Sequence, residues 1–176
     1  VQCAFAATLV ADGDTIIYVT GNQAQSTGQE RRNGFMEAFA AARPNSKVLE
    51  VPTEWNSQQA QEGVEAVLNA NSDVKMVANA WDGGTMGAKA ALENLGYSAG
   101  DVKLVGFDGA SDAIGAMDEG WVHADTAQML YQMGYQGIKA AAAAARGEDV
   151  SSRIDTGFFL VTPETSGVYK KMVGIE

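Results

Sequence analysis

The feature that most constrains the fold is a regular alternation along the chain. Between residues 14 and 117, a short apolar run of strand length is followed four times by a segment with helical periodicity. The four apolar runs are residues 15–20, 47–51, 74–78 and 102–107. Strands that alternate with helices are typical of a parallel sheet whose connecting helices cover both faces. The sequence therefore predicts an α/β fold with a parallel sheet flanked by helices on both faces.

Residues typical of helix ends separate these units. Pro44 is expected to end the first helix, because the residue before a proline disfavours the helical conformation. Ser57 is expected to cap the second helix, and Gly96 to terminate the third in a left-handed conformation. A short helix over residues 112–117 is predicted after the fourth strand.

The segments outside these units have a different character. Residues 1–11 resemble the tail of an amphipathic helix with no cap ahead of it, so we expect the chain to begin inside an element. Residues 121–126 are predicted as a fifth, more exposed strand, because apolar and polar side chains alternate there. A long helix is expected over residues 132–145, with an alanine run of high helix propensity. Residues 153–161 are predicted to carry a last pair of short strands around Gly157.

Composition excludes several classes of function. The 176 residues suit about one domain, and the formal net charge of -10 disfavours a nucleic-acid partner, which needs clustered Lys and Arg. Cys3 is the single cysteine, so neither an intramolecular disulfide framework nor a multi-cysteine zinc site is possible. The Asp12–Asp14 turn has too few ligands for a calcium loop. We expect no metal and no cofactor.

An enzymatic function has little support in the sequence. The only histidine, His123, lies on a predicted strand with Asp125 two residues later, and a solvated edge histidine is the simpler interpretation. There is no Gly-x-Ser-x-Gly elbow and no Walker-type phosphate loop. The glycines of residues 83–87, at a helix start, permit anion binding but more often serve only the turn. We therefore expect a protein that is not an enzyme.

The most informative side chains follow the predicted strands, where parallel sheets bind their ligands. Trp55 and Trp81 lie at such positions, together with the acids Glu54, Asp82 and Asp108. Aromatic rings pack against the C–H groups of a polyhydroxy compound, while carboxylates accept hydrogen bonds from its hydroxyls. The alternative is that both tryptophans only cover the strand ends.

Five motifs in order resemble one known family. The sequence is similar to the second half of the ribose-type periplasmic solute-binding proteins of ABC transporters, which have the type I periplasmic binding protein fold. The motifs are Arg-Arg-Asn-Gly-Phe at 31–35, Trp-Asp-Gly-Gly-Thr-Met-Gly-Ala at 81–88, Val-Gly-Phe-Asp-Gly at 105–109, Ala-Asp-Thr-Ala-Gln at 124–128, and the closing segment at 154–163. The resemblance covers nearly the whole chain and implies the C-terminal lobe of such a protein.

This resemblance implies half of a ligand site. Arg31 would bind ligand oxygens in a bidentate way, and Asp108 would accept two ligand hydroxyls. Gln128, at the crossover into the other lobe, would bind a further hydroxyl and report closure. Trp55 takes an aromatic position that stacks on the sugar.

Two neighbouring residues leave the identity of the ligand open. Trp81 replaces a family asparagine that would bind hydroxyls, and an indole has one donor and no acceptor. The pattern therefore favours a ligand with a broad apolar face: a different pentose or hexose, a polyol or a modified sugar. Asp82 either points into the cleft or only caps its helix, and the sequence favours neither.

The resemblance also implies how the chain is divided. Residues 1–128 would form the C-terminal lobe, residues 129–157 would return to an N-terminal lobe that the chain lacks, and residues 158–176 would close the C-terminal lobe. Such a protein would be periplasmic, or otherwise extracytoplasmic and membrane-associated, and would deliver its ligand to a membrane permease. We expect the isolated chain to bind sugar weakly or not at all, and to dimerise or pair with a separate N-terminal fragment through residues 129–145.

A second function shares this fold, namely the effector-binding core of a LacI-type transcription regulator. Such cores usually follow the last strand of this lobe with a Pro-Leu-Thr-Thr element, whereas this chain has a different sequence over residues 118–128. The transport function is therefore the preferred hypothesis.

Overall fold

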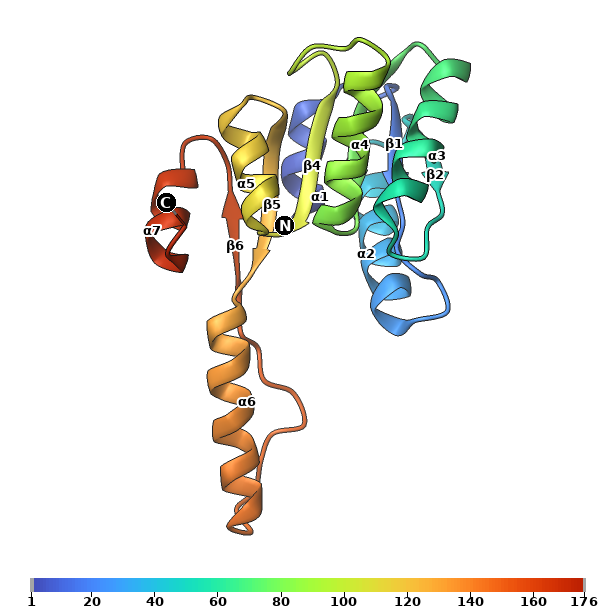
Figure 1. Ribbon diagram of the computed structural model, residues 1–176. Coiled ribbons are helices and arrows are strands. Elements are labelled where there is room, and N and C mark those ends of the chain that lie inside the picture. Colours follow the sequence, from blue (N-terminus) through green and yellow to red (C-terminus); the bar gives the residue numbers. More distant parts are fainter. Residues whose placement is uncertain (1, 176) are drawn as a thin grey trace.

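Six strands form a single sheet in the computed structural model, which describes residues 2–175 (Figure 1). The spatial order is β2-β1-β3-β4-β5-β6, with β1 to β5 parallel and β6 antiparallel to β5. The strands are β1 (Thr15–Val19), β2 (Lys47–Val51), β3 (Val74–Asn79), β4 (Lys103–Asp108), β5 (Val122–Gln128) and β6 (Phe158–Val161). The predicted parallel sheet is confirmed.

Helices cover both faces of this sheet, as the alternation predicts (Figure 1). One face carries α1 (Gln2–Ala6), which continues as a 3-10 turn (Ala7–Leu9), and α2 (Ser26–Ala42). The other face carries α3 (Ser57–Ala70), α4 (Asp82–Asn94) and α5 (Ser111–Asp118). The last two helices are α6 (Leu130–Ala145) and α7 (Ser166–Val173).

Strand β1 anchors the helix that carries Arg31. Tyr18 is fully buried and its ring stacks on Phe35, with centroids 4.3 Å apart, and Phe35 stacks in turn on Phe39. The Tyr18 hydroxyl also donates to the backbone carbonyl of Arg31 at 3.2 Å. Because burying aromatic side chains contributes most of the packing energy of such a contact, α2 is held rigidly against the sheet.

Helix α6 projects away from the sheet (Figure 1). None of its residues is buried, and Tyr131 and Ile138 keep 78% and 75% of their surface exposed. It begins at Leu130, two residues before the predicted start at Gln132. Residues 148–157 return beside it as irregular chain.

The structure corrects three local predictions. The side chain of Asn56, not Ser57, caps α3 by accepting from the Gln59 amide at 3.0 Å. Only β6 forms in the segment predicted to hold two short strands, and α7 was not predicted. The fifth strand is buried rather than exposed, because α1 and α5 pack against its two faces while β4 and β6 pair with its edges. The predicted stop of α4 at Gly96 is confirmed by its φ of +80°.

Candidate ligand-binding site

The strand order reverses beside β1, because the chain passes from β1 outward to β2 and then returns to β3 on the other side. Parallel sheets bind ligands in the crevice at the carboxyl ends of the strands beside such a reversal. A groove of about 380 Å³ lies there. Its lining comprises Gln25, Thr27, Arg31, Trp55, Trp81, Asp108 and Gln128. All the predicted ligand residues except Asp82 therefore meet in one place.

Arg31 reaches the groove from α2. Its Nη1 donates to the carbonyl oxygen of Ala80 at 2.6 Å and lies 3.1 Å from Oδ1 of Asp108. The guanidinium also stacks over the Phe107 ring, 4.2 Å from its centroid. These contacts fix the plane of the guanidinium while 18% of the side chain stays exposed to the groove.

Asp108 ends β4 in a strained conformation. Its φ is +128°, a region that side chains rarely occupy and that costs about 1–3 kcal/mol. The carboxylate accepts from Nε2 of Gln128 at 2.6 Å and pairs with Arg31. The next residue is also held, because the Tyr169 hydroxyl donates to the Gly109 carbonyl at 2.9 Å. Arg31, Asp108 and Gln128 thus form a polar row supplied by α2, β4 and β5.

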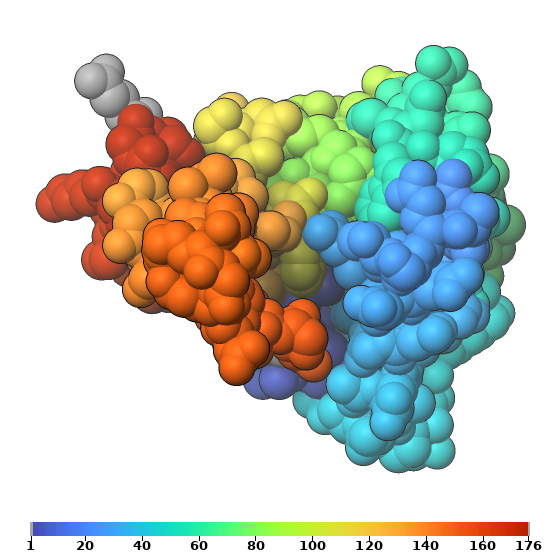
Figure 2. Space-filling model, turned by 90° about the horizontal axis from the view of Figure 1, so that it is seen from below, coloured from blue at the N-terminus to red at the C-terminus, as the bar shows by residue number. Residues whose placement is uncertain are grey.

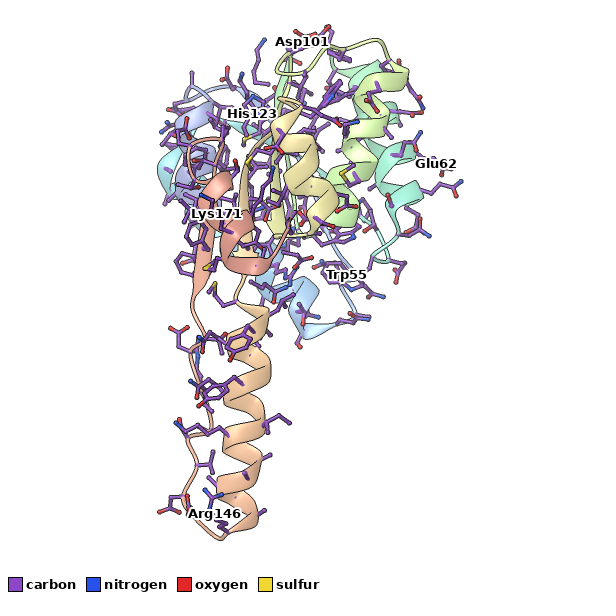
Figure 3. All side chains as sticks on the ribbon, turned by 60° about the vertical axis from the view of Figure 1, so that its left-hand side comes forward. Trp55, Glu62, Asp101, His123, Arg146 and Lys171 are labelled. Carbon is purple, nitrogen blue, oxygen red and sulfur yellow. The ribbon has the colours of Figure 1, made fainter. Side chains whose placement is uncertain are left out.

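Two indoles form the apolar wall of the groove. Trp55 and Trp81 meet edge to face, with ring centroids 5.3 Å apart and planes at 88°. Trp55 has a φ of +59°, and its Nε1 donates to Oε1 of Gln25 at 2.7 Å. Trp55 lies at the end of the sheet from which α6 leaves, opposite to Asp101 (Figure 3). The tryptophans cover the strand ends and line the groove at the same time.

Glycines make room for both indoles. A Cβ atom on Gly21 would lie 2.1 Å from Cη2 of Trp55, and one on Gly83 would lie 2.6 Å from Nε1 of Trp81. Gly84 meets the same Trp81 ring. The glycines at the start of α4 therefore serve the packing of Trp81.

Asp82 lies behind the groove rather than in it. The side chain is 3% exposed, and its two oxygens accept from the backbone amides of Phe107 at 3.1 Å and Ala110 at 2.7 Å. Neither sequence alternative describes it, because it caps no helix and faces no cleft. Trp81 takes the N-cap position of α4 and makes no side-chain cap.

Some lining residues were missed by the sequence reasoning. Gln25, the N-cap of α2, and Thr27, in its first turn, follow β1 in a segment that carries neither a charge nor an aromatic ring. Phe107, whose ring packs against the guanidinium of Arg31, lies within the motif at 105–109. Its contact with α2 depends on how that helix packs against the sheet.

A second hollow of about 510 Å³ adjoins the groove, between α2 and the start of α6 (Figure 2). Arg31 and Gln128 line both spaces. Its remaining walls include Cys3, Phe35 and Met133. The polar row therefore lies at the boundary between the groove and this second hollow.

His123 takes no part in this site. It is half-buried on β5, and its pKa is lowered, mainly by burial and also by the nearby charge of Lys103. Trp55 lies well away from it, toward the opposite end of the molecule (Figure 3). Because β6 pairs with β5 only from Asp125 to Gln128, His123 lies beyond the paired part of this edge, and it is half-buried rather than fully solvated as the sequence predicts.

The comparison with protein families agrees with this arrangement. A family profile described as the periplasmic binding protein domain matches residues 1–149. The chain belongs to this family. None of the helices within residues 2–175 is both long and apolar enough to cross a bilayer.

Two curated relatives in Escherichia coli (strain K12) are members with named ligands. The chain is 30% identical to the ribose import binding protein RbsB over 160 residues, which cover 91% of this chain and 53% of that protein. It is 32% identical to the D-allose-binding periplasmic protein over 131 residues, or 74% of this chain and 42% of that protein. The chain thus spans about half the length of the curated relatives it matches.

A solved structure shows the same relationship. An ABC transporter solute-binding protein from Bacillus halodurans C-125 with bound myo-inositol superposes with a TM-score of 0.87 at 26% identity. The match covers 97% of this chain and 58% of that one. The resemblance to type I periplasmic binding proteins is therefore confirmed at the level of fold and family.

Proposed function

We propose that this chain supplies the C-terminal lobe, and with it half of the ligand site, of a binding protein for a sugar or polyol that serves an ABC transporter. The observation that carries the proposal is the polar row of Arg31, Asp108 and Gln128 beside two perpendicular indoles, at the carboxyl edge of the sheet. The family membership and the names of the relatives support it.

The polar row has the donors and acceptors that vicinal hydroxyls require. Oδ1 of Asp108 is already engaged by Arg31 and Gln128, so Oδ2 is the acceptor left for a ligand hydroxyl. Arg31 retains N–H donors beyond those used on Ala80 and Asp108. Charge-assisted hydrogen bonds of this kind are stronger than neutral ones, which suits a ligand otherwise well solvated by water.

The indole pair favours a ring-shaped ligand. Trp55 and Trp81 line the same groove with their ring planes nearly perpendicular, so they offer apolar surface in two directions to the C–H groups of a ligand. We propose a monosaccharide or a cyclic polyol. Ribose and D-allose, which the relatives' names give as their ligands, and myo-inositol, bound in the structural relative, are compounds of this kind.

The long exposed helix supports a two-lobed architecture. We keep the division into residues 1–128, 129–157 and 158–176 as part of this proposal, with the middle segment completing a second lobe. An apolar surface made of Leu130, Tyr131, Tyr135 and Ile138 lies on α6 without a covering element within residues 2–175. Exposed apolar patches of this kind mark interaction surfaces. The second lobe would cover it and bring the other half of the ligand contacts.

Transport follows from closure of two lobes. A ligand that contacts both lobes only in the closed form shifts the population toward that form, and a permease can then recognise the closed surface. The protein would act in the periplasm, as one relative's name states for that relative, and would bind rather than convert its ligand.

Calorimetric titration tests this function. The two-lobed protein is titrated with D-ribose, D-allose and myo-inositol, and the 176-residue chain is titrated alongside it. We expect saturable binding of at least one compound by the two-lobed protein and much weaker binding by the chain. Absence of binding across these and a wider panel of pentoses, hexoses and polyols would refute the proposal. Salt-sensitive binding to operator DNA would instead support the LacI-type function.

A further inference from the structure

A second buried carboxyl lies beside Asp82. Asp125, in the middle of β5, is 0% exposed, and Asp82, in the first turn of α4, is 3% exposed. Both side chains converge over Gly106 of β4. A Cβ atom on Gly106 would lie 2.3 Å from Oδ2 of Asp125 and 2.7 Å from Oδ1 of Asp82. Only glycine leaves room for two carboxyls to meet at this point.

The hydrogen bonds of the two carboxyls are unequal. Both oxygens of Asp82 accept from backbone amides, those of Phe107 and Ala110, which lie on either side of Asp108. Within residues 2–175, by contrast, both oxygens of Asp125 are buried without a hydrogen-bonding partner. A buried unpaired carboxylate is costly, and two adjacent ionised carboxylates are costlier still. One proton held between them removes both costs, because the protonated carboxyl donates to the other.

We propose that Asp82 and Asp125 share one proton and together act as a positioning pair for Asp108. The pair ties the backbone on both sides of Asp108 to α4 and β5, and this keeps the carboxylate of Asp108 in its strained conformation facing Arg31. Asp82 and Asp125 are positioning residues, since neither lines the groove. The consequence for ligand affinity rests on the proposed function, whereas the shared proton does not.

The electrostatics of the surroundings support retention of the proton. Burial raises the pKa of Asp82 strongly, and the charge of Asp125 raises it further. Burial also raises the pKa of Asp125, with contributions from the charges of Asp108 on β4 and Asp112 on α5, while the neighbouring carboxyl of Asp82 and backbone amide of Gly109 lower it. Tyr169 on α7 faces the same pair, and its pKa is raised by burial and by both carboxylates.

The direction of the pH dependence follows from these shifts. A carboxyl whose pKa in the folded state exceeds its ordinary value of 3.8 binds its proton more tightly when folded. The stability that this proton contributes is complete below the ordinary pKa and is lost as the pH rises through the raised pKa. The backbone around Asp108 should therefore loosen on the alkaline side.

The shared proton is tested without any ligand. Carbon-13 NMR titration of the carboxyl carbons in the 176-residue chain is expected to show one carboxyl of the pair still protonated at neutral pH. Titration of both Asp82 and Asp125 near the ordinary value of 3.8 would overturn the proposal. Because no sugar is present, this result does not depend on whether the proposed function is right.

Matched variants test the positioning role. In Asp125→Asn an amide replaces the proton as the donor to Asp82, so the Phe107 and Ala110 amides should keep their protection from hydrogen exchange while the pH dependence of that protection disappears. In Asp82→Ala protection at both amides should fall by about tenfold or more. Asp149→Asn, the same change at an exposed aspartate, is the control and should match the parent chain.

Two outcomes would contradict this role. One is an unchanged pH profile of protection in Asp125→Asn, and the other is undiminished protection in Asp82→Ala. In the two-lobed protein, whichever of D-ribose, D-allose and myo-inositol binds should bind at least about tenfold more weakly to Asp82→Ala. Unchanged affinity combined with lost protection would show that the pair stabilises the turn but does not position Asp108.

Discussion

Arg31 and Asp108 form an ion pair across the floor of the groove, with Nη1 of the arginine 3.1 Å from Oδ1 of the aspartate. The arginine is also bonded to the Ala80 carbonyl, and the aspartate to Gln128. Both charged groups are therefore oriented before a ligand arrives. Orientation in advance lowers the entropy that binding must otherwise overcome.

Removing either member of this pair should weaken ligand binding. In the two-lobed protein, Arg31→Ala or Asp108→Ala should reduce affinity by about 1.5–3 kcal/mol per charged hydrogen bond lost, or roughly 10- to 150-fold. Arg32→Ala is the matched control, because Arg32 pairs with Glu50 and does not line the groove. Calorimetric titration measures all three variants, and wild-type affinity in the Arg31 and Asp108 variants would exclude this half-site.

Trp81 should report ligand binding through its fluorescence. The ring is 9% exposed and borders the groove, so a bound sugar should quench or shift its emission. The ligand-dependent change should shrink in Trp81→Phe and persist in Trp121→Phe, since Trp121 packs near Lys89, outside the groove. An equal loss of signal in both variants would assign the response to a global change instead.

Gly21 should be required for the placement of Trp55. In Gly21→Ala the added methyl group would lie 2.1 Å from the indole, and Trp55 is held between Gln25 and Trp81. The ring must shift, so ligand affinity should fall and the Trp55 emission should change. The control is Gly115→Ala in α5, where nothing lies within 4 Å. That change should raise the free energy of unfolding by up to about 1 kcal/mol.

The exposed face of α6 should drive association of the isolated chain. We expect the chain to dimerise, or to bind a separate N-terminal fragment, by burying Tyr131 and Ile138. Ile138→Glu should shift the population to monomers in size-exclusion chromatography with light scattering. Ala144→Glu adds the same charge on another side of the helix and should not. A chain that is monomeric before any substitution would contradict this prediction.

Much of the fold could be predicted because its signals are local. The alternation of strand-length runs and helical segments predicted β1 to β4 and the helices after them, and the alternating polarity of residues 121–126 predicted β5. Gly96 marked the end of α4. The predictions that were wrong concern features that depend on contacts with distant segments of the chain. The burial of β5 depends on α1, which lies more than a hundred residues earlier in the chain, and on β6, which pairs with it from thirty or more residues further along. Segment 153–157 remains irregular beside α6.

The candidate site divides in the same way. The sequence by itself determined which residues follow the strands, and the topology of a parallel sheet brings strand ends together, so Arg31, Trp55, Trp81, Asp108 and Gln128 could be named in advance. The direction in which a side chain points is not determined by the local sequence. Only the tertiary structure decided that Asp82 turns away from the groove, because the amides of Phe107 and Ala110 and the carboxyl of Asp125 come within its reach only after β4 and β5 have packed against α4.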